Sequence, residues 1–338
     1  MIESSDLLHL PYTPDLTEGG IAFTCRSLAS TTGRTGGAPL VRLRQSVAEV
    51  AAELAFRRTL SEQDIPFGVL GATPFTQPER YDVSLGGHRC NLKSFIITHR
   101  PQITQLRRDP ARLLQAPALV PLDEVAAEGH KPDDLYLFAF LLGVVAVTPG
   151  DEQRAKAAGL PNYLIHPLPD KWAHPANWLP LEKLVLKSDC EAPISVEIGG
   201  LNAGREFVTD RLELPSKKSV HVEQCFHSLA YIHAARTPEA RIGLHSPVCG
   251  ESNIILAHEW GNIWVYGMDI FMTGWLSHED YRRKAKVLNI GVRTLQDEHT
   301  SVKNLQVLMA ELNPLRPLFE RVRIWAESHK MVNQGIIN

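Results

Sequence analysis

Two strand-like segments joined by the dipeptide Gly86-Gly87 constrain the fold of this chain more than any other feature. Polar and apolar side chains alternate over residues 81–85, and the alternation resumes over residues 88–97, beyond the glycines. Such a period of two is typical of β-strands. Since consecutive glycines readily adopt the backbone angles of a tight turn, the pattern predicts a β-hairpin over residues 81–97.

Helical and strand-like patterns surround this hairpin. Before it, residues 40–63 predict a helix whose apolar side chains recur at spacings of three and four. These apolar residues are Val47, Val50, Ala51, Leu54 and Ala55. After it, residues 100–115 are basic with helical spacing, and residues 122–128 indicate another helical turn. The apolar run at residues 135–147 predicts one or two buried strands, so the first half indicates an α/β fold.

The second half is richer in short strand-like segments. They cover residues 184–187, 194–198, 207–214, 220–222 and 263–271. Residues 225–235 fit a helix or a strand, and the glycine-rich stretch at residues 199–204 fits a turn. Ser277 and Asp280 form a capping signature for a basic helix that we expect to extend to about residue 288.

The order of these patterns predicts the domain organisation. Residues 161–180, rich in proline and tryptophan, indicate a packed connector between two domains, and residues 315–330 predict a last amphipathic helix. We therefore expect an N-terminal segment at residues 1–30 and an α/β domain at residues 31–180. A β-rich domain of unknown role, with C-terminal helices, should follow at residues 181–338.

The composition narrows the class of protein. Of the 338 residues, 44% are hydrophobic and 22% are charged, as in ordinary globular proteins. The net charge of −3 argues against coating nucleic acid through bulk charge, but it allows a local basic cleft. Five scattered cysteines without a CxxC pair support neither a zinc ribbon nor a disulfide framework. Neither a signal-peptide pattern nor an apolar stretch of the ~20 residues that a membrane helix needs is visible, so we expect a cytoplasmic protein without a membrane partner.

The predicted hairpin brings together side chains that suit phosphodiester hydrolysis. Asn91 and Lys93 are two positions apart and therefore project from one face of the returning strand, and the turn brings Asp82 alongside them. A carboxylate can hold a divalent cation that polarises a phosphate and lowers the pKa of a bound water. A nearby ammonium group can position that water or offset developing charge. Magnesium prefers hard oxygen ligands, so one or two carboxylates and a backbone carbonyl suffice.

This stretch resembles the PD-(D/E)XK nuclease superfamily, whose pattern is an acidic residue, a hairpin turn and an acidic-X-Lys triplet. Asp82 matches the first acid and Lys93 matches the lysine, and the resemblance covers roughly residues 40–150. It implies a restriction endonuclease-like fold, an α/β mixed sheet flanked by helices. The cofactor that it implies is Mg²⁺, with Mn²⁺ as a substitute. The implied ligands are Asp82, Asn91, the backbone carbonyl of Leu92 and Glu53 of the leading helix, with Glu49 one turn earlier as a weaker candidate.

The same resemblance implies the biochemical role. It predicts an endonuclease that hydrolyses DNA phosphodiester bonds, in restriction or another defence against foreign DNA. Such an enzyme would act as a homodimer or with a partner protein of a defence system.

Asn91 departs from the family pattern, which has an acidic residue at this place. Three explanations are open: Glu53 or Glu49 compensates for the missing charge, the domain is a catalytically degenerate nucleic-acid-binding module, or Asn91 replaces an aspartate to inactivate the enzyme. A protein-interaction module whose β-rich half is the functional part is a further alternative. An ordinary surface hairpin is another, because Leu186-Lys187-Ser188 repeats Leu92-Lys93-Ser94 without an acid before it.

Overall fold

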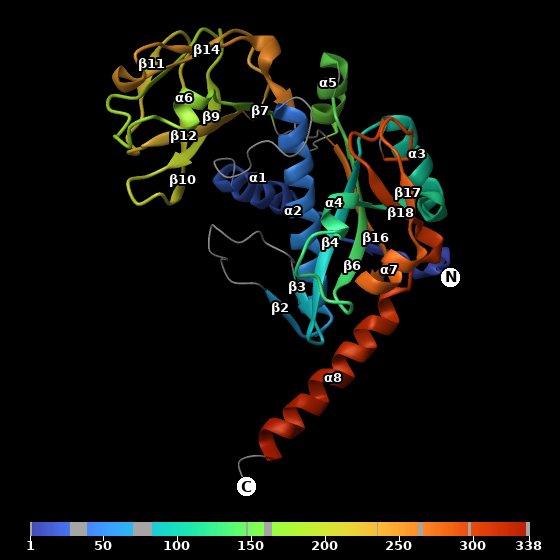
Figure 1. Cartoon of the computed structure of the whole chain (residues 1–338). Coiled ribbons are helices and arrows are strands. Elements are labelled where there is room, and N and C mark those ends of the chain that lie inside the picture. The colour runs from blue at the N-terminus through green and yellow to red at the C-terminus, as the bar shows by residue number, and fades with distance from the viewer. Residues whose placement is uncertain are drawn as a thin grey trace. The chain divides into compact units, whose positions relative to one another are not determined.

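The computed structural model describes residues 2–27, 39–69, 83–146, 148–158, 164–234, 236–262, 266–296 and 299–335. Contacts between residues divide the chain into two compact units. Figure 1 shows the whole chain, coloured by residue number. Unit 1 combines Met1–Leu16, Ala48–Gly143 and Gly267–Asn338. Unit 2 combines Thr17–Val47 and Val144–Tyr266. The three predicted segments are each continuous, whereas each unit combines separate stretches of chain.

Unit 1 contains a mixed sheet of six described strands. In spatial order they are β1 (Leu8–Leu10), β16 (Tyr266–Ser277), β6 (Leu135–Val144), β4 (His88–Ile97), β3 (Val83–Leu85) and β2 (Phe67–Val69). Strands β2, β3 and β4 form an antiparallel meander, and β4 pairs with β6 in parallel. The side chains of β6 are buried at all ten positions, as expected of a central strand covered on both faces. The fold is therefore mixed α/β, and the predicted buried strand is confirmed.

The hairpin between β3 and β4 is confirmed over the described residues. Leu85 pairs with His88 across the turn, so Gly86 and Gly87 form a two-residue loop. Both glycines have positive φ, 56° and 84°, as the favoured two-residue hairpin turn requires. Strand β4 has the bounds that the alternation predicted.

Helices α3 (Arg100–Arg108), α4 (Leu122–Val125), α7 (His278–Lys284) and α8 (Leu315–Gly335) belong to unit 1, whereas α1 (Pro14–Ser27) and α2 (Pro39–Glu62) are each divided between the two units. Short 3₁₀ turns lie at Ser4–Asp6, Pro110–Gln115 and Met309–Glu311. In the predicted apolar stripe of α2, Val47, Ala51 and Ala55 are buried, whereas Val50 and Leu54 are half-buried.

The C-terminal helices lie in unit 1, which differs from the predicted arrangement. We expected them to follow the β-rich domain, but β16 lies beside β1 in the six-stranded sheet, and α7 and α8 follow it. The Ser277 side chain accepts a hydrogen bond from the backbone nitrogen of Asp280 at 3.1 Å, as its capping signature predicted. The helix ends at Lys284 rather than near residue 288.

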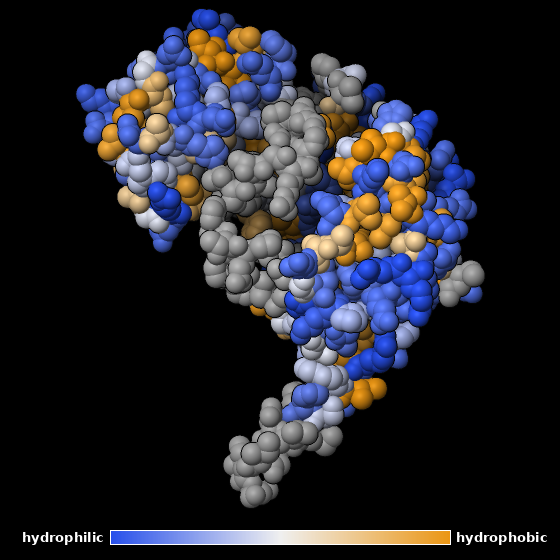
Figure 2. All heavy atoms as spheres, in the orientation of Figure 1, coloured by the Kyte–Doolittle hydropathy of each residue, from blue (hydrophilic) through white to orange (hydrophobic). Residues whose placement is uncertain are grey.

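A small antiparallel sheet explains this early end of α7. Its strands are β17 (Lys286–Leu288), β18 (Asn304–Leu308) and β5 (Pro117–Pro121). The hydroxyl group of Tyr281, on α7, lies 2.8 Å from the carbonyl oxygen of Ala118 and 2.7 Å from that of Leu305. Figure 2 shows apolar side chains gathered over the part of unit 1 that β17 and β18 occupy in Figure 1, where Val287 and Leu308 are exposed.

Unit 2 is built from two antiparallel sheets. The first contains β10 (Phe207–Leu214), β9 (Ile194–Leu201), β12 (Ser228–Ala234), β7 (Leu164–Pro167) and β15 (Gly261–Asn262). The second contains β11 (Ser219–His221), β8 (Val185–Ser188), β13 (Ile242–His245) and β14 (Asn253–Ile255). The other described elements of Val144–Tyr266 are helices α5 (Pro149–Ala157) and α6 (Asp170–Ala173) and 3₁₀ turns at Pro247–Cys249 and Ala257–Glu259.

The core of unit 2 includes part of the predicted connector. Trp172 of α6 is fully buried, and β7 pairs with β12 inside the first sheet, so residues 164–173 are an integral part of this unit. The ambiguous segment at residues 225–235 forms strand β12 over Ser228–Ala234. Among the described residues, no helix combines the length and the apolar character needed to cross a membrane.

Candidate functional site

Strand β4 presents a row of polar side chains on one face of the six-stranded sheet. Arg89, Asn91 and Lys93 alternate with the buried residues Cys90 and Leu92, so the three polar groups point to one side. Strand β6 pairs with β4 in parallel, so the residues of β6 that pair with this row extend the same face of the sheet. The hairpin and the alternation thus predicted correctly that Asn91 and Lys93 lie together.

A carboxylate from outside the hairpin meets this row. Glu124 of α4 places its Oε1 atom 2.5 Å from Nζ of Lys93 and 3.5 Å from Nδ2 of Asn91. The side chains of Lys93 and Glu124 are only 19% and 28% exposed, so water screens this ion pair less than one on the open surface. Lys93 and Asn91 thus share one acceptor oxygen.

The short helix α4 holds Glu124 in this place. It follows β5 directly, and the Leu122 backbone nitrogen donates to the Lys303 carbonyl oxygen at 3.0 Å. Val125 on the same turn is buried. The sequence predicted this helical turn but gave no role to its glutamate, because nothing in the local pattern of residues 122–128 indicates a partner on β4.

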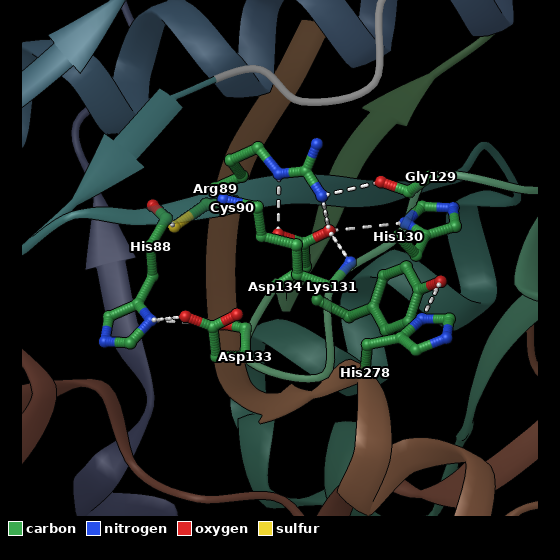
Figure 3. A network of polar contacts seen from close by, with 10 residues as sticks. His88, Arg89, Cys90, Gly129, His130, Lys131, Asp133, Asp134 and His278 are labelled. Carbon is green, nitrogen blue, oxygen red and sulfur yellow. Dashed lines mark hydrogen bonds and ion pairs between the residues drawn. The ribbon is translucent and has the colours of Figure 1, made fainter.

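At the other end of the row, Arg89 joins a dense polar network, drawn in Figure 3. Its Nε atom donates to Oδ1 of Asp134 at 2.7 Å, and its Nη2 atom donates to Oδ2 of Asp134 and, at 2.8 Å, to the carbonyl oxygen of Gly129. The backbone nitrogen of Lys131 also donates to Asp134, at 2.8 Å. This network fixes the loop that leads into β6 against β4.

A tyrosine and two histidines lie beside this network. The Tyr136 hydroxyl group lies 3.1 Å from Nδ1 of His278, and the His278 ring stacks on that of His130, with 4.8 Å between ring centroids. Burial raises the pKa of Tyr136, and the charges of Glu124 and Asp134 raise it further. Burial lowers the pKa of His278, and His130 lowers it too. The hydrogen bond between Tyr136 and His278 therefore joins two neutral groups at neutral pH.

The remaining predicted site residues are distributed as follows. Asp82 lies outside the described residues. Glu53 is on α2, where it pairs with Arg57 one turn later, and among the described residues it forms no ion pair with Lys93. Glu49 is exposed on the same helix, and the Leu92 side chain is buried opposite the polar row.

The described part of the site offers oxygen donors of the kind that magnesium prefers. Glu124 has a carboxylate and Asn91 has an amide oxygen, and both are hard ligands. Within the described stretches of chain, no three His, Cys, Asp or Glu side chains are grouped closely enough to hold a metal ion, and Asp82 falls outside that comparison. The donor set fits a hard divalent cation in its chemistry.

Comparisons of this chain with models of protein families, with curated proteins and with solved structures found no match.

Proposed function

We propose that unit 1 is a divalent-metal-dependent endonuclease that hydrolyses DNA phosphodiester bonds, with Asp82, Asn91 and Lys93 at its centre. The observation that carries the proposal is the shared position of Asn91 and Lys93 on one face of β4, beside a carboxylate. Support also comes from the element order. A long helix, a hairpin and a further core strand follow one another as the resemblance to PD-(D/E)XK nucleases implies.

The residues of the chain would divide the chemistry among them. Asp82 and Asn91 would hold Mg²⁺ or Mn²⁺, assisted by Glu53 of α2 and by the Leu92 backbone carbonyl. When bound, such an ion polarises a phosphate and lowers the pKa of a coordinated water. Lys93 contributes a fixed positive charge, which orients the attacking water or stabilises negative charge on the phosphate as it develops.

The biological setting follows from the resemblance alone. We propose restriction or another defence against foreign DNA, with the chain acting as a homodimer or beside a partner protein. A second candidate is a nucleic-acid-binding module that has lost catalysis, and the amide at Asn91 favours it because an amide lacks the charge of the usual acid. A protein-interaction role for the β-rich half is the third.

Cleavage of supercoiled plasmid DNA in Mg²⁺ or Mn²⁺ tests these candidates. The experiment compares the native chain with Asn91→Asp, which adds the family's second acid without changing the side-chain shape. Cutting by either form supports the nuclease. DNA binding without cutting by both forms supports the binding module, and neither binding nor cutting supports the interaction role.

A further inference from the structure

We infer that a groove in unit 1 binds an extended, acidic segment of a partner protein. The groove lies between α3 with the 3₁₀ turn that follows it, the three-stranded sheet of β17, β18 and β5, and residues 292–295 of the loop after β17. Its volume is about 700 Å³, within the range of ~300–1,000 Å³ that ligand-binding clefts occupy. All of its lining residues belong to unit 1, and the inference does not depend on the proposed nuclease chemistry.

The groove is open to solvent rather than enclosed. Most of the charged and amide side chains that line it are exposed, namely Gln105, Asp109, Arg112, Gln115 and Arg293. A polypeptide segment can therefore enter the groove from the surface without any rearrangement of its walls.

Two glutamines give the groove hydrogen-bonding groups that the chain itself does not use. Within the described stretches of chain, the amide groups of Gln115 and Gln306 form no hydrogen bond. Gln102 differs, because its Nε2 atom donates to the Leu295 carbonyl oxygen at 3.4 Å and so connects α3 to the loop. An amide side chain has both a donor and an acceptor, as a peptide group has. The amides of Gln115 and Gln306 therefore match the main chain of an extended segment.

The charge of the groove favours an acidic occupant. Among the lining residues that the structure describes, Asp109 is the one acid, and its carboxylate lies 3.3 Å from Nε of Arg112. Arg293 pairs with no carboxylate within the described residues, so the lining carries +1, counting the two arginines as +1 each and Asp109 as −1. Lys286 pairs with Gln306 across the two strands and adds a positive charge on the same face of the sheet. A carboxylate of the bound segment would pair with Arg293.

Aliphatic side chains form the floor of the groove. Leu106 and Leu288 are buried at its base, whereas Val292 and Leu308 are exposed. Figure 2 shows apolar side chains gathered over this part of unit 1. Covering exposed apolar surface stabilises a complex, so we expect the bound segment to place aliphatic side chains on Val292 and Leu308.

Other occupants suit the groove less well than a peptide. Among the described lining residues none is aromatic, so a nucleobase would have no ring on which to stack. A lipid chain would leave the amides of Gln115 and Gln306 without hydrogen-bond partners, which costs free energy once water is excluded. A peptide satisfies the amides, the positive charge and the apolar floor together.

Selection of random peptides displayed on phage against the full-length chain tests the inference. We expect the enriched peptides to combine aspartate or glutamate with aliphatic residues. A fluorescent synthetic peptide of an enriched sequence should bind Arg293→Glu and Leu308→Ser about tenfold or more weakly than the native chain, as measured by fluorescence anisotropy. The matched controls are Arg316→Glu on α8 and Ile254→Ser on β14, which are exposed outside the groove and should bind as the native chain does.

Two further comparisons predict gains of affinity, which misfolding cannot produce. Asp109→Asn removes the acid that pairs with Arg112, so it should bind the acidic peptide more tightly than the native chain. Arg293→Glu should regain affinity for a copy of the peptide in which lysine replaces each acidic residue. If thermal unfolding shows that Arg293→Glu or Leu308→Ser is destabilised, these two gains decide.

The inference is wrong if no peptide is enriched, if the enriched peptides lack acidic residues, or if they bind Arg293→Glu and Leu308→Ser as tightly as the native chain. Sedimentation with phosphatidylserine vesicles and binding of a single-stranded DNA oligonucleotide are measured with the same variants. A loss there, without peptide binding, would assign the groove to lipid or nucleic acid and overturn the inference. Absence of plasmid cleavage by the native chain and by Asn91→Asp would refute only the nuclease, because Asn91 does not line the groove.

Discussion

Arg89 and Asp134 are joined by two parallel hydrogen bonds that connect β4 to the loop before β6 (Figure 3). Asp134 is 8% exposed and accepts a further hydrogen bond from the Lys131 backbone nitrogen. The backbone nitrogen of His278 in turn donates to the carbonyl oxygen of Asp134 at 2.7 Å. The Asp134 carboxylate therefore holds Arg89, at the end of the polar row, in place. Helix α7 contacts the same loop before β6 through the backbone nitrogen of His278.

We expect Asp134→Ala to destabilise unit 1 by about 3–5 kcal/mol, because it leaves the half-buried guanidinium of Arg89 without its anion. The neighbouring change Asp133→Ala is the matched control. Asp133 is 59% exposed and pairs only loosely with His88, at 3.2 Å, so its loss should cost less than about 1 kcal/mol. Urea unfolding followed by circular dichroism measures both. Equal losses would show that the network in Figure 3 is not a stabilising unit.

The two Leu-Lys-Ser segments of the chain provide a sharp test of catalysis. We expect Lys93→Met to lower the rate of plasmid cleavage by about 10²-fold or more, since it removes a fixed charge beside the reacting phosphate. Lys187→Met is the control: this lysine lies on β8 in unit 2, is 57% exposed and pairs with Asp189 at 3.7 Å. Cleavage rates at saturating Mg²⁺ measure the effect. A Lys93→Met protein that cuts as fast as Lys187→Met would remove Lys93 from the mechanism.

Local patterns predicted the parts of the fold that depend on neighbours in the chain. Alternation and the diglycine turn predicted the bounds of β4, and the strand-like pattern of residues 207–214 predicted those of β10. Both features act over a few residues, because strand alternation has a period of two and a tight turn needs only its own backbone angles. The position of Asn91 beside Lys93 follows from the same periodicity.

Contacts between distant parts of the chain could not be predicted in this way. Glu124 and Asp134 reach β4 from 33 and 45 positions away, and nothing in their local sequence distinguishes them from other surface acids. The position of β16 between β1 and β6 could not be predicted either, because strand order depends on tertiary packing rather than on chain order. The predicted turn at residues 199–204 was wrong for Gly199, Gly200 and Leu201, which lie inside β9.

His278 should make the stability of unit 1 depend on pH. Its pKa is lowered in the folded protein by burial and by the nearby His130 and Arg282, and raised less by Asp134. Below the ordinary pKa of 6.5, the unfolded chain therefore binds a proton that the folded protein resists. The contribution of His278 to the free energy of unfolding should be constant above about pH 6.5. Below that pH the free energy of unfolding should fall, by at most about 1.4 kcal/mol per pH unit for one proton.

The variant His278→Asn isolates this contribution. Asparagine keeps a polar group near Nδ1 but cannot be protonated, so stability should fall less steeply between pH 6.5 and pH 5 than in the native chain. His174→Asn, at an exposed position in unit 2, is the control and should keep the native slope. Urea unfolding at a series of pH values gives both slopes. The same slope in His278→Asn and in the native chain would exclude His278 as the titrating group.

Gly200 should tolerate no side chain, because β12 approaches β9 too closely at this position. A Cβ atom on Gly200 would lie 2.0 Å from the carbonyl oxygen of Ser228, and this oxygen belongs to backbone that cannot turn away. We expect Gly200→Ala to destabilise unit 2 by about 3 kcal/mol or more. Gly243→Ala, on β13 of the same unit, meets nothing within 4 Å and should be neutral or slightly stabilising. Urea unfolding followed by tryptophan fluorescence, with Trp172 in the core of unit 2, measures both variants. Similar stability of the two would mean that β9 and β12 can separate at Gly200 without cost, contrary to their close pairing in this sheet.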